Sequence, residues 1–327
     1  MIHGPAQVRS NAGGFFVREL GTGSVAGQLH RSGKLLRIAI FLPAWQSAQI
    51  RAAMNTHDQI CVADSWDSLE SLVRLEPLSV VVFNPAAAGT MDNARACRLI
   101  RKYASIPFVA YVAVDAAVVH GIAHMSNDGL QDVVVYHSDD SPLRFRRTLE
   151  RVSQIPQVSM LIGKLQPWFS QLPAALVDVL RDTLRDPHAY SSAEDIAAGA
   201  DVTLSALYRS FRNARLNSPK SFVIGARVFR GCVYLKDAGF SIGDVSMKLG
   251  YTQPRIFAHH IECVLGDSPS KVRRSLADED AVNRIVSWLC SSRRHASDLL
   301  QHHVARVVCF LALLDWFGDL AGVLGFS

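Results

Sequence analysis

The chain has 327 residues, of which 49% are hydrophobic and 19% charged, and its formal net charge is +5. This length allows two domains, each with its own core, and the mild positive charge favours contact with polyanions. Six scattered cysteines lack the paired spacing of a zinc or disulfide framework, so they indicate a reducing, cytoplasmic setting. Because no catalytic constellation of Ser, His, Asp or Cys stands out, we expect no enzyme and no bound cofactor or metal.

Residues 1–34 are rich in Gly, Ser and Arg and lack the apolar segment of a signal peptide. Such a composition is typical of a flexible arm. We expect the rest of the chain to divide into a first domain at 35–155, a linker at 156–171, a second domain at 172–276 and a C-terminal helical extension at 277–327.

Short apolar runs alternate with amphipathic stretches in the first domain. The apolar runs predict strands at 36–41, 60–63, 80–83, 108–112 and 133–136. The stretches between and after them predict helices at 45–54, 69–75, 92–103, 116–125 and 142–152. Strands that are apolar throughout are typical of a parallel sheet covered on both faces. The predicted fold of this domain is therefore α/β, with five parallel strands in the flavodoxin-like order.

In length and rhythm, the first domain resembles the receiver domain of response regulators. Receivers bind Mg²⁺ with an acidic pair after the first strand, and they carry a phosphoacceptor Asp after the third, a Ser or Thr after the fourth and a Lys after the fifth. A hard cation needs carboxylate oxygens, and an amide is no nucleophile for phosphoryl transfer. We therefore predict a pseudo-receiver with a degenerate phosphoacceptor position. The corresponding residues here are Leu42 and Pro43, then Asn84, then Val112, then Tyr136 or His137.

Three roles remain open for such a domain. Receivers dimerise through the face formed by their fourth helix, fifth strand and fifth helix, so the resemblance implies a homodimer through that face. A structural spacer is an alternative. A small-molecule pocket at the carboxyl ends of the strands, near Asn84 and Tyr111, is another, although the sequence names no effector.

A segment of about fifty residues occurs twice in the second half of the chain. In register, Leu207 corresponds to Phe257, and the Asn-Ser-Pro triplet at 217–219 corresponds to Asp-Ser-Pro at 267–269. Each copy predicts a short helix, a tight turn, a second helix and a Ser-Pro helix start. This is the pattern of a helix-turn-helix, and it predicts an all-α domain with two such units that enter successive grooves of DNA.

Capping residues place the two recognition helices. Thr203 is the predicted N-cap of a helix over 204–215, and Thr252 is the predicted N-cap of the corresponding helix that ends at 265. Between them, an apolar helix from Ser218 to Gly239 is expected to be largely buried. At 1.5 Å per residue its roughly nineteen residues span about 28 Å. Successive major grooves on one face of a duplex recur at about 34 Å, so this helix has a suitable length for a strut.

These motifs carry a specific family resemblance. The run 242–261, with Asp244, Gly250 and Phe257 at their spacings, is followed by Gly266-x-Ser268-Pro269 and is similar to the signature of the AraC/XylS family of transcription regulators. The likeness covers about 172–274, and it implies a seven-helix domain that binds promoter DNA. Four residues depart from those common in the family, which leaves the fold intact and affects the affinity and target sequence of the second unit. They are Arg255, His259, Glu262 and Val272.

The type of each outward residue predicts whether it contacts a base or a phosphate of the DNA. Arg209 and Arg255 can each donate two hydrogen bonds to guanine, and Gln253 can bond adenine in the same way; each contact is worth about 1–3 kcal/mol of base discrimination. Phosphate contacts set register and salt dependence and carry no sequence code. The predicted phosphate contacts are Arg212, Lys220, Lys271, Arg273 and Arg274, and the remaining outward residues are Ser205, Ala206, Pro254 and His259. Glu262 would repel phosphate and is excluded.

The predicted partners are double-stranded promoter DNA, a second copy of the chain and RNA polymerase. Two alternatives stay open: a phosphorylation-dependent response regulator with a relocated phosphoacceptor, and a protein-interaction adaptor that has lost its DNA affinity. The apolar segment 304–326 is long enough to span a bilayer, yet Arg306, Asp315 and Asp319 make insertion costly. We expect a helix that packs on the body or on a second subunit, without membrane contact.

Overall fold

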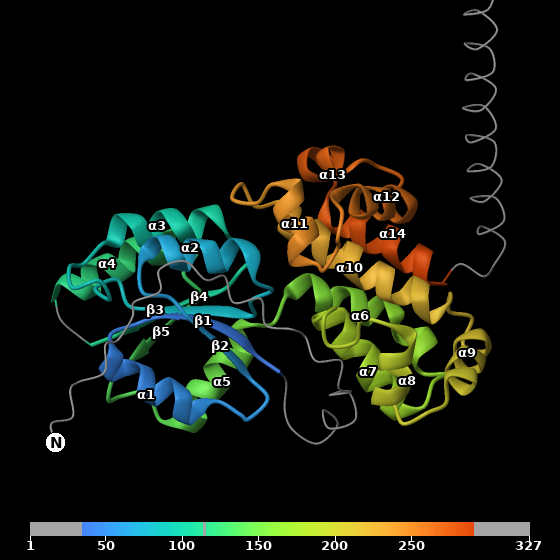
Figure 1. Ribbon diagram of the computed structural model, residues 1–327, viewed down its shortest axis with the longest axis horizontal. Coiled ribbons are helices and arrows are strands. Elements are labelled where there is room, and N and C mark those ends of the chain that lie inside the picture. Colours follow the sequence, from blue (N-terminus) through green and yellow to red (C-terminus); the bar gives the residue numbers. More distant parts are fainter. Residues whose placement is uncertain (1–34, 114–115, 291–327) are drawn as a thin grey trace, which may run out of the picture.

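The computed structural model describes residues 35–113 and 116–290, which form an α/β unit and a helical unit side by side (Figure 1). The predicted arm at 1–34 and the apolar segment 304–326 lie outside the described residues.

The α/β unit contains a five-stranded parallel sheet. In chain order the strands are β1 Arg37–Phe41, β2 Gln59–Val62, β3 Val80–Phe83, β4 Phe108–Val112 and β5 Asp132–Val135. Their order in the sheet is β2-β1-β3-β4-β5, and every neighbouring pair is parallel. The predicted flavodoxin-like topology is confirmed, and its strand order reverses between β1 and β3.

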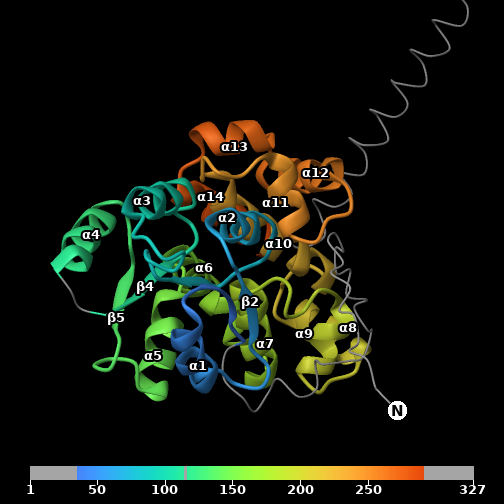
Figure 2. The same ribbon diagram turned by 60° about the vertical axis from the view of Figure 1, so that its left-hand side comes forward.

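Helices cover both faces of the sheet (Figure 1, Figure 2). Successive side chains of a strand point to opposite faces, so each strand packs against both layers of helices. Ile38 and Ile40 of β1 pack on the face of α1 Ala44–Ala53 and α5 Pro142–Val152. Ala39 and Phe41 pack on the opposite face, in the cluster that includes Trp66. The helices on that face are α2 Trp66–Leu75, α3 Asn93–Lys102 and α4 Ala116–Asn127.

The helical unit is built around one buried helix, α10 Pro219–Leu235, in which twelve of seventeen residues are buried. Helices from before and after it in the chain contact its different sides. The other helices of the unit are α6 Pro156–Phe169, α7 Ala174–Arg185, α8 Ala193–Gly199, α9 Leu204–Asn213, α11 Ile242–Lys248, α12 Pro254–Leu265, α13 Pro269–Ser275 and α14 Asp278–Cys290.

The structure corrects the predicted linker at 156–171. Those residues form helix α6, which buries Leu161, Leu165 and Phe169 and contacts α7 and α14. Helix α14 occupies the first part of the predicted extension at 277–327 and contacts α10, α6 and α12. Both segments were assigned outside the second domain because the surfaces that bury them come from distant parts of the chain.

The two units share one continuous apolar core. Helix α2 contacts α11, and the loop between α10 and α11 lies against the end of α3 (Figure 1, Figure 2). In that loop, the Gly239 N–H donates to the Lys102 carbonyl at 3.0 Å, and the Phe240 ring centroid lies 5.0 Å from that of Tyr103. The loop therefore fixes the helical unit directly onto the α/β unit.

Gly239 stands where a side chain has no room, because an added Cβ would overlap the Tyr103 ring. We expect Gly239→Ala to lower the free energy of unfolding by about 1–3 kcal/mol, the usual cost of overpacking a filled core. Urea denaturation measures the change. Gly243→Ala is the matched control: its added Cβ would meet the Ser241 Oγ at an ordinary 3.6 Å, so no comparable loss is expected. Equal losses in both variants would contradict the close contact at Gly239.

Candidate DNA-binding surface

Helices α8 and α9 occupy the segment predicted as the first helix-turn-helix, and we refer to them as the first unit. Asp201 adopts a left-handed backbone conformation in the turn, with φ of 52°. Thr203 Oγ1 then accepts a hydrogen bond from the Ala206 N–H at 3.2 Å, which confirms Thr203 as the N-cap of α9. Helix α9 buries only Leu207 and Phe211, so most of its surface faces outward.

Helices α11 and α12 occupy the segment predicted as the second helix-turn-helix, and we refer to them as the second unit. A capping box at Ser241 starts α11, and Gly250, with φ of 76°, forms the turn. Helix α12 begins at Pro254 with Gln253 as its N-cap, so the predicted cap Thr252 is wrong by one residue. Proline suits the first helical position because it lacks the N–H that a cap would satisfy.

Both recognition helices rest on α10. Phe211 of α9 meets the Phe222 ring nearly perpendicularly, with centroids 5.9 Å apart. Phe257 of α12 lies against Gly231, where an added Cβ would come within 2.8 Å of its ring. Helices α9 and α12 lie on the side of the helical unit that faces away from the sheet (Figure 1). The strut has seventeen residues, about 26 Å at 1.5 Å per residue, rather than the nineteen predicted.

The predicted base-contacting residues Arg209, Gln253 and Arg255 are all exposed. Within the described part of the chain, neither Arg209 nor Arg255 forms an ion pair. Their guanidinium groups are therefore available to an external acceptor. The other predicted residues that are exposed are Ser205, Arg212, Lys220, Pro254, His259, Lys271 and Arg274, and Ala206 is half-buried.

Two predicted phosphate contacts are engaged by the protein itself. The Arg273 guanidinium donates to the carbonyls of Leu235 and Phe240, at 2.8 and 2.7 Å. These bonds tie α13 to the end of α10, so we assign Arg273 a structural role in place of the predicted phosphate contact. Lys271 Nζ lies 2.5 Å from the Asp267 carboxylate. The sequence shows that both residues are basic, but it does not show the carbonyl and carboxylate groups that folding brings next to them.

Sequence reasoning missed the apolar side chains on the recognition helices. Leu204 and Tyr208 of α9 are 39% and 40% exposed, and Ile256 of α12 is 38% exposed. Apolar side chains of this kind can contact the methyl group of thymine in the major groove. Their spacing was a usable signal, because Leu204 and Tyr208 stand four residues apart, outside the stripe of Leu207 and Phe211.

At the end of β3, the predicted degenerate phosphoacceptor position is occupied by an amide that bonds other groups of the chain. Asn84 Nδ2 donates to Gln46 Oε1 at 2.9 Å, and Asn84 Oδ1 accepts from the Ala86 N–H at 2.9 Å. The buried Gln46 in turn donates to the Tyr111 carbonyl at 3.3 Å. The Asn84 amide therefore already has partners on both its oxygen and its nitrogen.

Lys248, the last residue of α11, joins the second helix-turn-helix to the α/β unit. Its side chain is buried, and Nζ donates to the carbonyls of Val73 and Glu76 at the C-terminal end of α2, the first at 2.8 Å. Nζ also lies 5.2 Å from the Tyr234 ring centroid and 5.3 Å from that of Phe240. A helix C-terminus and two aromatic faces favour a cation.

Burial nevertheless opposes the charge on Lys248. Removal from water lowers the pKa of Lys248 to about 7, and the nearby Arg230 guanidinium acts in the same direction. The amine retains donors for the two carbonyls of α2 in either protonation state. The sequence did not predict this role, because residue 248 falls at a position that the quoted motif leaves unspecified.

No family model matches the chain. It is 29% identical over 82 residues to the Msm operon regulatory protein of Streptococcus mutans, a match that covers 25% of this chain and 30% of that protein. It is 26% identical over 108 residues to the lactose operon transcription activator of Staphylococcus xylosus, which covers 30% of this chain and 38% of that protein. The chain thus spans less than two fifths of the length of either relative.

A search of solved structures finds full-length FixJ from B. japonicum, with 13% sequence identity and a TM-score of 0.32 over 71% of this chain and 99% of that one. Both curated relatives are named as regulators of operons, one of them as a transcription activator. Within residues 35–113 and 116–290, no helix is long and apolar enough to cross a membrane.

Lys248 makes the stability of the protein depend on pH. Its pKa is about 7 in the folded chain against an ordinary value of 10.5, so between these values the unfolded chain binds the extra proton and stability rises with pH. From roughly pH 7 to 9, we expect the native protein to gain about 1–2 kcal/mol of stability relative to Lys248→Met. Urea denaturation at each pH measures it. Lys248→Arg stays charged throughout and should show no such rise in stability. If the native protein behaves like this control, the lowered pKa of Lys248 is contradicted.

Proposed function

We propose that the chain is a sequence-specific transcription regulator of the AraC/XylS type, which binds double-stranded promoter DNA with both helix-turn-helix units. The observation that carries the proposal is the duplication: two recognition helices rest on one buried strut, and each exposes an arginine without an ion pair, Arg209 and Arg255. Similarity to two proteins named as operon regulators supports it. Contact with RNA polymerase is part of the same proposal.

The α/β unit acts independently of phosphorylation in this proposal and serves in dimerisation or signal input. Asn84 cannot accept a phosphoryl group as an aspartate does, and its amide is held by Gln46. The face of α4, β5 and α5 is the proposed homodimer surface. Val119 of α4 and Leu143 of α5 are large apolar side chains exposed on these helices, and a second copy would remove them from water.

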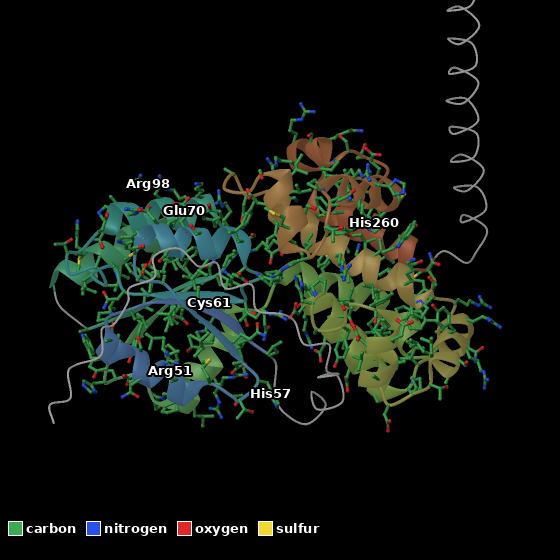
Figure 3. All side chains as sticks on the ribbon, viewed as in Figure 1. Arg51, His57, Cys61, Glu70, Arg98 and His260 are labelled. Atoms are coloured by element: carbon green, nitrogen blue, oxygen red, sulfur yellow. The ribbon has the colours of Figure 1, made fainter. Side chains whose placement is uncertain are left out.

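Replacement of both arginines tests the DNA-binding role. We expect Arg209→Ala/Arg255→Ala to weaken binding to a promoter fragment by at least about 30-fold, since each bidentate contact is worth about 1–3 kcal/mol. A genome-wide map of bound sites supplies the fragment, and binding is measured at two salt concentrations. The control Arg98→Ala/Arg147→Ala removes two exposed arginines from the α/β unit, where Figure 3 shows Arg98 far from His260 of α12. If the native chain binds no DNA even at low salt, the adaptor alternative replaces this proposal.

Phosphorylation independence has its own test. We expect the intact mass of the native protein to stay unchanged after incubation with a small phosphodonor and Mg²⁺, because Asn84 offers no carboxylate and Leu42 and Pro43 offer no ligand for the cation. A receiver domain with a complete acidic pair, treated in parallel, shows that the donor is active. A phosphoryl group added to the native chain would favour the phosphorylation-dependent alternative.

A further inference from the structure

The internal repeat supplies a comparison within one molecule. At the repeat offset, the four basic residues of 201–220 correspond to residues of 251–270 that carry no positive charge when histidine is neutral. The pairs are Arg209 with His259, Arg212 with Glu262, Arg215 with Leu265 and Lys220 with Ser270. Counting all charged side chains, the first window has four basic and one acidic residue, for a net +3, and the second has one basic and two acidic, for a net −1.

The cations of the first unit are free to meet an external anion. Arg209, Arg212 and Arg215 are exposed at and beyond the outward face of α9, and Lys220 is exposed at the start of α10. Within residues 35–113 and 116–290, none of the four forms an ion pair or a side-chain hydrogen bond. An unpaired, hydrated cation can replace the counter-ions of a phosphate without first breaking an internal contact.

Several cations around the second unit already pair with groups of the protein itself. Lys271 and Arg284 both pair with the Asp267 carboxylate, at 2.5 and 2.7 Å. These two contacts lower the pKa of Asp267 from its already acidic ordinary value. Arg273 is bound to two carbonyls of the chain, as described above, which leaves Arg274 as the exposed cation of α13 without an ion pair among the described residues.

Glu262 lies on the outward face of the second recognition helix. It follows Arg255 by seven residues and His259 by three, spacings that put all three on one side of α12. All three side chains are exposed. A carboxylate on this face repels the phosphates that Arg212 would attract from the same position of α9.

We infer that the two helix-turn-helix units contribute unequally to DNA binding: the first supplies most of the contacts to the phosphate backbone, and the second adds less counter-ion release and depends more on the base sequence. This rests on the proposed DNA-binding function. Phosphate contacts strengthen binding to every sequence, whereas base contacts strengthen it only where they fit. The second unit, with Glu262 among its outward side chains, therefore favours DNA only where contacts such as those of Gln253 and Ile256 find their bases.

Matched double variants measure the difference. Arg212→Gln/Arg215→Gln removes two charges from the first unit, and Lys271→Gln/Arg274→Gln removes two from the second. With a duplex of mixed sequence, the slope of log Kd against log salt should fall by about 1.8 in the first variant, since each phosphate contact contributes about 0.9. In the second variant the slope should fall by no more than about 0.9, because Lys271 pairs with Asp267 and only Arg274 is without an ion pair. Thermal melting by circular dichroism confirms that each variant is folded.

Glu262→Arg is the complementary gain-of-function variant. It places a cation at the position that corresponds to Arg212, so the salt slope should steepen by about 0.9 and binding should tighten at low salt. Glu262→Gln removes the repulsion between the carboxylate and the phosphates without adding a cation. It should tighten binding, but it should steepen the salt slope less than Glu262→Arg does. Equal slope losses in the two double variants, or no effect of Glu262→Arg, would overturn the unequal division while DNA binding itself stands. A native chain that does not bind DNA overturns the proposed function and this inference with it.

Discussion

The buried strut α10 is the constraint on which the arrangement of the helical unit depends. Twelve of its seventeen residues are buried, and helices from both sides of it in the chain contact it. Both recognition helices are placed through it, α9 by Phe222 and α12 by the close approach at Gly231. Because a filled core deforms little, the two outward faces keep one spacing set by the strut. A fixed spacing is what the proposed contact with the repeating grooves of a duplex would require.

The α/β unit is attached to this arrangement through the second helix-turn-helix. Lys248 bonds the last carbonyls of α2, and Asp237 accepts hydrogen bonds from the Ser105 backbone N–H at 3.1 Å. Burial raises the pKa of Asp237 to about 6, so this interface contains two charged groups that water no longer stabilises fully. Polar groups of this kind are costly unless their partners are in place, which gives the interface one favoured geometry. A change in the position of α2 would therefore also displace α11, which is bonded to it through Lys248.

Much of the fold was predictable from local pattern. Each of the five strands was placed to within one residue at either end, because a strand buried on both faces needs an uninterrupted apolar run. Thr203 was predictable as an N-cap because its hydroxyl bonds a backbone N–H three residues away. Thr252 was misplaced because Pro254 starts α12 one residue later, without a side-chain cap. Helix α6 was taken for a linker because its apolar residues Leu161 and Leu165 find partners only in distant helices.

For the candidate DNA-binding surface, the sequence by itself determined the repeat and the class of each outward side chain, since these are properties of residue type and spacing. Only the tertiary structure decided which charges remain available. Arg273 and Lys271 look alike in sequence to Arg212, yet folding brings backbone carbonyls to the first and Asp267 to the second. The physical reason is that a charge is neutralised by whatever lies within a few ångströms in space, and distance along the chain does not specify those neighbours.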